Sequence, residues 1–108
     1  MPKSGAQAMG AWSHPPKAAG EDIQQTCDQV RKAVEDKING GQPFGQFNAT
    51  LFIEQVVEGW NYRIKVQINT VTLIRIQVYQ SPFKVHDGPT PPVLNAVAAD
   101  GPLNDKPF

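Results

Sequence analysis

Residues 21–38 carry an apolar stripe with the spacing of an α-helix. The stripe recurs at steps of four, three, four and four residues and consists of Ile23, Cys27, Val30, Val34 and Ile38. Polar side chains fill the positions between them, so these residues fall on one helical face. Acidic residues at 21 and 22 suit the positive end of the helix dipole, and Gly40–Gly41 suits a left-handed C-terminal end. The pattern predicts a helix from about residue 21 to about residue 38.

Beyond Gly41 the hydrophobic pattern becomes that of β-strands. Apolar and polar residues alternate over 61–69 and again over 74–79, which is typical of antiparallel strands with one buried face. Phe47–Val57 is less regular because three apolar residues follow one another at 51–53, but its β-branched and aromatic residues also favour a strand. Asn69–Thr70 predicts a tight reversal between two of these strands. We expect an α+β fold, in which the helix packs across the apolar face of the sheet.

The two ends of the chain lack a regular pattern. Residues 1–20 are rich in Ala, Gly and Pro and are expected to be extended and mobile. After Ser81, prolines at 82, 89, 91 and 92 are expected to break any strand, so that only Val93–Val97 returns as a short edge strand. We expect one domain over residues 1–108, with 1–20 as a flexible N-terminal trunk and 98–108 as a C-terminal tail.

Composition narrows the class of partner. Ten Lys and Arg residues balance ten Asp and Glu residues, so no basic field exists to hold a nucleic acid backbone, and nucleic acid is not expected as a partner. No apolar run is long enough to span a bilayer, so no membrane association is expected either. A single cysteine and an N-terminal segment without a continuous apolar stretch indicate an intracellular, cytoplasmic protein.

Residues that carry catalytic or metal-binding chemistry are sparse. His14 and His86 stand alone, without a second ligand at metal spacing, and are interpreted as surface residues. Cys27 lies on the apolar helix stripe, which favours a buried side chain over a nucleophile. The carboxylates form no separated acid and base pair, and no glycine-rich loop follows a strand. We expect neither an enzyme nor a bound metal or cofactor.

The segment QVVEG, residues 55–59, lies between two predicted strands, where most soluble proteins place polar turn residues. If it forms a hairpin tip, Gly59 supplies the positive φ of the turn, and Val56 and Val57 stand partly exposed. Such a tip is typical of an interaction site that enters a partner's groove. The alternative is that both strands extend further and bury the valines.

Several motifs in this order resemble the stefins, the single-domain intracellular branch of the cystatin superfamily. These motifs are DQVRKAVEDK at 28–37, QVVEG at 55–59, NYRIKV at 61–66 and VYQS at 78–81, with a glycine in the N-terminal segment. The resemblance spans about Met9 to Val97. It implies a five-stranded antiparallel sheet wrapped around one helix. It also implies tight, reversible, noncovalent inhibition of papain-like cysteine proteases such as the cathepsins.

The resemblance further implies three contact elements that together block the cleft holding the protease's catalytic Cys and His. They are the trunk around Gly10, the first hairpin at 55–59 and a second hairpin just after Ser81. The expected protease-binding residues are Met9, Gly10, Gln55, Val56, Val57, Glu58, Gly59, Pro82 and Phe83. An apolar tip can fill such a cleft without offering a peptide bond to be cut.

Three positions depart from the stefin pattern. Glu58 replaces the small residue usual at the fourth position of the first loop, and Trp60 replaces a small polar residue. The second hairpin reads Ser-Pro-Phe-Lys at 81–84 and lacks the Leu-Pro pair typical of stefins. The changes at Glu58 and Trp60 are expected to alter which protease fits.

A rival interpretation is a binding or self-assembling protein with this fold and no inhibitory activity. In a domain-swapped dimer the first hairpin opens and strands are exchanged between two copies. That exchange straightens Gln55–Gly59, so the dimer and the inhibitory tip compete for the same residues. A monomer is expected, with the swapped dimer as the alternative state.

Overall fold

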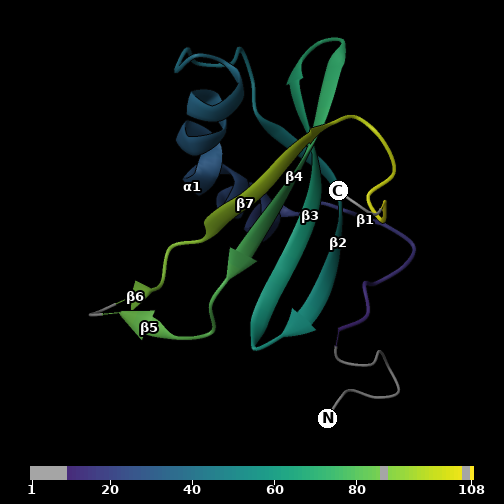
Figure 1. Ribbon diagram of the computed structural model, residues 1–108, viewed down its shortest axis with the longest axis vertical. Helices are drawn as coiled ribbons and strands as arrows, with labels where there is room; N and C mark the ends of the chain where they lie inside the picture. Colours follow the sequence, from purple (N-terminus) through teal and green to yellow (C-terminus); the bar gives the residue numbers. More distant parts are fainter. Residues whose placement is uncertain (1–9, 86–87, 106–107) are drawn as a thin grey trace.

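The computed structural model describes residues 10–85, 88–105 and 108. In this part of the chain, one helix lies against a five-stranded antiparallel sheet, and two further strands pair in a short arm (Figure 1). The helix is α1 (Glu21–Ile38). The strands are β1 (Lys17–Ala18), β2 (Asn48–Val57), β3 (Gly59–Asn69), β4 (Thr72–Gln80), β5 (Lys84–Val85), β6 (Gly88–Pro89) and β7 (Val93–Ala99). The sheet order is β1-β2-β3-β4-β7, which confirms the predicted α+β fold.

The core lies between α1 and the sheet face turned toward it. Residues paired across neighbouring strands share a face, and the row Phe52–Ile64–Ile76–Val97 faces the helix. Cys27 and Val34 meet this face from α1 and are fully buried. The alternation seen in the sequence therefore does correspond to one face buried beneath the helix.

The helix begins and ends where the pattern predicts, but the end of its stripe differs. Ile38 is 44% exposed, so its prediction as part of the buried stripe is wrong. It ends α1, and the chain turns away at once, with Gly40 at φ +60°. Glu35 is buried instead, because its carboxylate accepts hydrogen bonds from Arg31 Nε at 2.9 Å and from the Phe44 amide at 3.0 Å.

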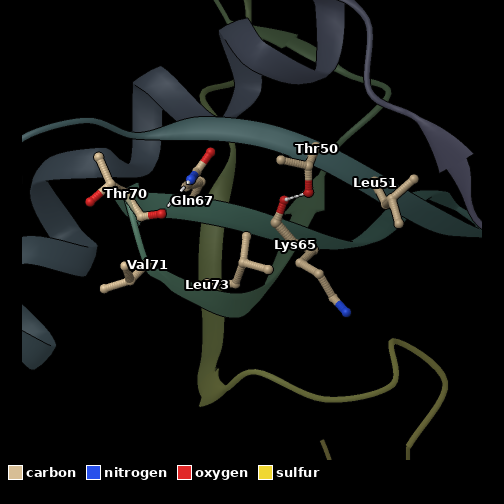
Figure 2. A pocket seen from close by; sticks show the side chains of 7 residues that line it. All are labelled: Thr50, Leu51, Lys65, Gln67, Thr70, Val71 and Leu73. Atoms are coloured by element: carbon tan, nitrogen blue, oxygen red, sulfur yellow. Dashed lines mark hydrogen bonds between the residues drawn. The ribbon is translucent and has the colours of Figure 1, made fainter.

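A β-bulge explains the irregular pattern of β2. The register with β3 shifts at Thr50, whose hydroxyl donates a hydrogen bond to the Lys65 carbonyl oxygen at 2.9 Å (Figure 2). Leu51 therefore faces outward, beside an open groove that ends at the β3–β4 turn. Ile53 also lies on the outer face, opposite Arg63, yet it is fully buried. Three consecutive apolar residues thus serve two faces of the sheet.

The C-terminal third follows the prediction in part. β7 is an edge strand, as predicted, and continues to Ala99. The prediction that prolines break every strand before it is wrong, because β5 and β6 pair across Lys84–Pro89 and Val85–Gly88. Pro89 is tolerated because this two-stranded arm has edges on both sides, where a missing N–H leaves no ladder bond unmade.

The described part of the trunk is paired to β2, which the sequence did not predict. β1 adds to the edge of the sheet with Lys17 opposite Phe52, and Trp12 forms a further bridge with Gln55. The Ser13 amide donates to the Glu54 carbonyl oxygen at 2.8 Å. Residues 10–18 therefore run antiparallel to β2, from its C-terminal end near Val56 back to Leu51.

Candidate functional site

The first hairpin is built around a glycine that no other residue can replace without strain. β2 ends at Val57 and β3 begins at Gly59, which is buried and has a φ of +103°. A Cβ at this position would overlap the Gln80 carbonyl oxygen and lie 2.9 Å from both Pro82 Cδ and Tyr79 Oη. Gly59 therefore combines a left-handed backbone with close packing against the chain that follows β4.

The side chains of this hairpin tip are half-buried rather than hidden. The strand ladder extends to the Val57–Gly59 pair, so the strands are longer than the alternation indicated. Gln55, Val56 and Val57 nevertheless keep part of their surface exposed, and Glu58 is exposed at the vertex. Trp60, opposite Val56, is 37% exposed. The tip thus offers apolar surface together with one acidic side chain.

The trunk lies directly beside this tip. The Gly10 amide donates to the Val56 carbonyl oxygen at 3.1 Å, and Gln55 Nε2 donates to the Gly10 carbonyl oxygen at 2.7 Å. The side chain of Gln55 is oriented in turn by Asn61 Nδ2, 2.7 Å from its Oε1 atom. Gly10 is exposed and has a φ of +92°. Met9, the other trunk residue expected to bind, lies outside the described residues.

The segment after β4 forms the third element. Pro82 lies against Gly59, and the ring of Phe83 is 61% exposed. The Phe83 amide donates to Ser81 Oγ at 3.0 Å, and the Thr90 hydroxyl donates to the Phe83 carbonyl oxygen at 2.9 Å. The backbone around Phe83 is therefore held at both its N–H and its C=O, while the ring stays available.

These three elements lie at one end of the molecule. Figure 1 shows the β2–β3 tip and the β5–β6 arm at the end opposite the β3–β4 hairpin. Hydrogen bonds join the trunk to the tip, and the contacts of Gly59 join the tip to Pro82. We call the set formed by Gly10, residues 55–59, Pro82 and Phe83 the contact edge.

Three residues that the sequence did not mark as functional support this edge: Tyr79, Gln80 and Asn61. Tyr79 Oη donates to the Glu58 carbonyl oxygen at 2.5 Å, and Gln80 Nε2 donates to the Thr90 carbonyl oxygen at 2.7 Å. Tyr79 and Gln80 both stand in the VYQS motif, which marked their place but not their contacts. Asn61 is the first residue of the NYRIKV motif, which likewise marked its place but not its contact with Gln55.

Groups capable of catalysis do not gather at the contact edge. Cys27 is fully buried in the core between α1 and the sheet, as predicted, and burial, with a smaller effect of the Asp28 charge, raises the pKa of its thiol to about 12. His14 is exposed, as predicted, and His86 lies outside the described residues. Among residues 10–85, 88–105 and 108, no three His, Cys, Asp or Glu side chains converge as metal ligands. The edge can bind by shape and apolar contact.

A match to a known domain family covers most of this chain. The Cystatin domain model matches residues 10–86, which include the trunk from Gly10, the helix, the first hairpin and the start of the second. The chain belongs to the cystatin family. The matched span ends within the β5–β6 arm, so β7 and the C-terminal tail lie beyond it.

Relatives named Stefin-C and Cystatin-B confirm the predicted stefin branch. Stefin-C of Bos taurus is 40% identical over 73 residues, covering 68% of this chain and 69% of the relative. Cystatin-B of Homo sapiens is 40% identical over 63 residues, covering 58% of this chain and 62% of the relative. A pig protein, leukocyte cysteine proteinase inhibitor 1 of Sus scrofa, is 35% identical over 66 residues, covering 61% and 62%. The alignments thus span roughly two thirds of these relatives.

Within the described part of this cystatin, no helix is long and apolar enough to cross a membrane.

Proposed function

We propose that this cystatin is a tight, reversible, noncovalent inhibitor of papain-like cysteine proteases, the cathepsins among them. The observation that carries the proposal is the continuity of the contact edge. Gly10, the 55–59 tip and Pro82 come from three separate parts of the chain and contact one another in sequence. The pig relative's name, a cysteine proteinase inhibitor, supports the same activity.

The mechanism is steric. Val56 and Val57 present apolar surface that leaves water when the tip enters a protease cleft. The chain at the vertex turns back through Gly59, so no extended peptide bond is offered across the cleft. Gly10 has no Cβ, which permits close approach of the trunk to the protease, and Met9 is proposed to reach an apolar subsite beyond it. Pro82 and the exposed ring of Phe83 are proposed to contact the protease beside the tip.

Glu58 and Trp60 are proposed to set selectivity among proteases. Glu58 is exposed at the vertex, so its carboxylate would enter the protease cleft. Burying that charge without a partner costs free energy that an uncharged residue at this position would not. A cleft with a cationic or polar rim therefore suits this tip better than an apolar one. Trp60 widens the tip on the face of the sheet turned toward α1, because it alternates in step with Tyr62 and Ile64 along β3.

The test is a titration of papain with the monomer isolated by size exclusion. We expect near-stoichiometric, reversible inhibition, full recovery of intact protein from the complex, and no effect on trypsin. Recovery of a cleaved or covalent product would contradict the steric mechanism.

A matched pair of variants locates the activity. Val57→Asp places a charge at the contact edge, and Val71→Asp places the same charge on an 89% exposed valine in the β3–β4 turn at the opposite end of the molecule. We expect Val57→Asp to weaken inhibition by about a hundredfold or more, and Val71→Asp to leave it unchanged. Equal inhibition by both variants would remove the first hairpin from the site.

The rival function is self-assembly through a swapped dimer. Opening the β2–β3 hairpin would break the Val57–Gly59 pair and release Gly10 from Val56. The dimer should therefore lack inhibitory activity that the monomer has. A dimer peak that inhibits as well as the monomer would show that the intact tip is not required.

The remaining expectations concern setting and organisation. We propose a cytoplasmic location, which is supported by the single buried thiol and the absence of any cysteine to pair with it in this chain. We also propose that residues 1–108 form one domain, with 1–20 as its N-terminal trunk and 98–108 as its C-terminal tail. The pairing of residues 10–18 with β2 does not favour a flexible trunk over that stretch.

A further inference from the structure

Two buried arginines lie on the outer face of the sheet, away from α1. Arg63 on β3 and Arg75 on β4 are each only 8% exposed. Their mutual charge is unfavourable, and burial, followed by the charge of Arg75, lowers the pKa of Arg63. In the portion of the chain that the structure describes, one carboxylate pairs with them, Asp105, which is 3.4 Å from Arg75 Nη1. Burying two cations costs desolvation free energy unless other groups contact them. The segments that cover these two guanidinium groups therefore explain why they are buried.

The C-terminal tail covers both guanidinium groups. Arg63 Nη1 donates to the carbonyl oxygens of Leu103 and Asp105, at 3.1 and 2.9 Å. Arg75 donates from Nε to the Ala99 carbonyl oxygen at 2.6 Å and from Nη1 to the Pro102 carbonyl oxygen at 2.8 Å. Backbone carbonyl oxygens of the tail thus accept hydrogen bonds from both guanidinium groups. Leu103, in the same tail, is buried.

Aromatic rings from the two ends of the chain meet on the same guanidinium. Arg63 Cζ lies 4.5 Å from the centroid of Trp12 and 4.8 Å from the centroid of Phe108. The Phe108 ring also lies 5.0 Å from Arg75 Cζ. Cation–π contacts of this kind are strongest where the cation is shielded from water, as it is here. We call Trp12, Arg63, Arg75 and Phe108 the arginine clamp.

The trunk passes through this clamp on its way to the contact edge. Trp12 forms the bridge with Gln55, and the adjacent Ser13 amide is bonded to Glu54. Two residues before Trp12, Gly10 is bonded to Val56. Fixing the indole of Trp12 therefore limits how far the backbone of Gly10 can move from the tip. The C-terminal end itself lies well away from the tip in Figure 1.

We propose that Arg63 and Phe108 are positioning residues, which hold the trunk at Gly10 beside the first hairpin and so make the affinity for a protease depend on the C-terminal tail. This role rests on the proposed inhibitory function. The tail acts on affinity through Trp12, without contact between the clamp and the protease. Removal of Phe108 would then weaken inhibition while leaving the contact edge chemically intact.

Phe108 offers matched variants for the test. Phe108→Leu keeps an apolar side chain but removes the ring from both guanidinium groups, whereas Phe108→Tyr keeps the ring. Each is made in the 108-residue chain and in a version that starts at Ala11. Exchange of the Gly10 and Ser13 amide hydrogens is measured by NMR on the free protein, and dissociation from papain is measured on the complex.

We expect Phe108→Leu to speed exchange of the Gly10 and Ser13 amides and to raise the dissociation rate about three- to tenfold, with Phe108→Tyr restoring both. In the version that starts at Ala11, Phe108→Leu should not change dissociation further, because the positioned glycine is absent. A purely structural role would instead lower stability and affinity equally in both backgrounds, and would overturn the proposal.

Two other outcomes also overturn it, and they are distinguishable from failure of the inhibitory function. Unchanged amide exchange in Phe108→Leu refutes the clamp, whether or not the protein inhibits papain. Faster exchange with an unchanged dissociation rate refutes its effect on affinity. If the unaltered protein fails to inhibit papain, the proposed function fails and the effect on affinity fails with it, while the exchange data still decide whether the clamp holds the trunk.

Discussion

The hydroxyl group of Tyr79 donates a hydrogen bond to the backbone carbonyl oxygen of Glu58 at 2.5 Å. Tyr79 lies near the end of β4, and Glu58 is the vertex of the β2–β3 hairpin. One bond thus fixes the vertex to the strand that leads into the third contact element, Pro82 and Phe83. The shape of the contact edge is therefore a property of three strands together, and the hairpin alone does not set it.

Removal of this hydroxyl should loosen the vertex. Tyr79→Phe loses one hydrogen bond at a partly exposed site, which corresponds to about 1 kcal/mol. We expect about a fivefold faster dissociation from papain, with a change of only a few degrees in Tm. Stopped-flow dissociation and thermal unfolding measure the two effects. A large fall in Tm without a change in dissociation would assign Tyr79 to the fold alone.

Gly59 should tolerate no side chain. In Gly59→Ala the Cβ meets the Gln80 carbonyl oxygen and the backbone is strained at φ +103°, so we expect destabilisation by about 2–5 kcal/mol together with loss of inhibition. Gly45→Ala is the matched control, because no atom lies within 4 Å of its added Cβ and its φ is not positive. Urea unfolding of both variants checks this, and similar midpoints would contradict the packing of the hairpin on β4.

A version that starts at Ala11 should bind more weakly but remain folded. It loses the Gly10–Val56 bond and the acceptor for Gln55 Nε2, while the Ser13–Glu54 bond and β1 stay in place. We expect dissociation from papain about ten- to a hundredfold faster, because trunk contacts are lost, and nearly the same Tm. Loss of stability alongside inhibition would make residues 1–10 part of the fold.

Glu35 should make stability depend on pH in the acid range. The hydrogen bond from Arg31, and then that from the Phe44 amide, hold the pKa of this carboxyl below its usual range. Because the folded pKa lies below the unfolded one, the stabilisation is present above the ordinary carboxyl range and is lost as pH falls through the lowered pKa. Urea unfolding between pH 7 and pH 3 should show the advantage of the unaltered protein over Glu35→Gln shrinking as pH falls. If the difference in unfolding free energy between the two proteins stayed constant with pH, the charge of Glu35 would not contribute to stability.

Cys27 should react with a thiol reagent only after unfolding. Burial raises the pKa of its thiol to about 12, so little thiolate forms at pH 8 and the reagent has no access. We expect labelling of the native protein to follow the unfolding rate and to be fast in denaturant. Rapid native labelling would place the helix stripe at the surface and contradict the packing of α1.

The hydrophobic pattern of the sequence was sufficient to predict the helix and strands that form because neighbouring residues along the chain bury one face. The stripe from Ile23 to Ile38 predicted α1, and alternation predicted β3 and β4, because a helix or strand buries one face at a fixed period. Asn69–Thr70 marked its turn, and the VYQS and QVVEG motifs pointed to the family. The residues expected to bind a protease came from that resemblance and stay predictions.

What only the tertiary structure decided concerns contacts between distant segments. Ile38 shares the period of the stripe, but it lies where the chain leaves the sheet, and Glu35 is buried because a loop nine residues further on supplies the Phe44 amide. Arg63 and Arg75 occupy polar positions in their strands, and the alternation alone makes them surface residues. They are buried because Trp12 and Phe108 arrive from opposite ends of the chain, and no period along the sequence encodes where two such distant segments meet.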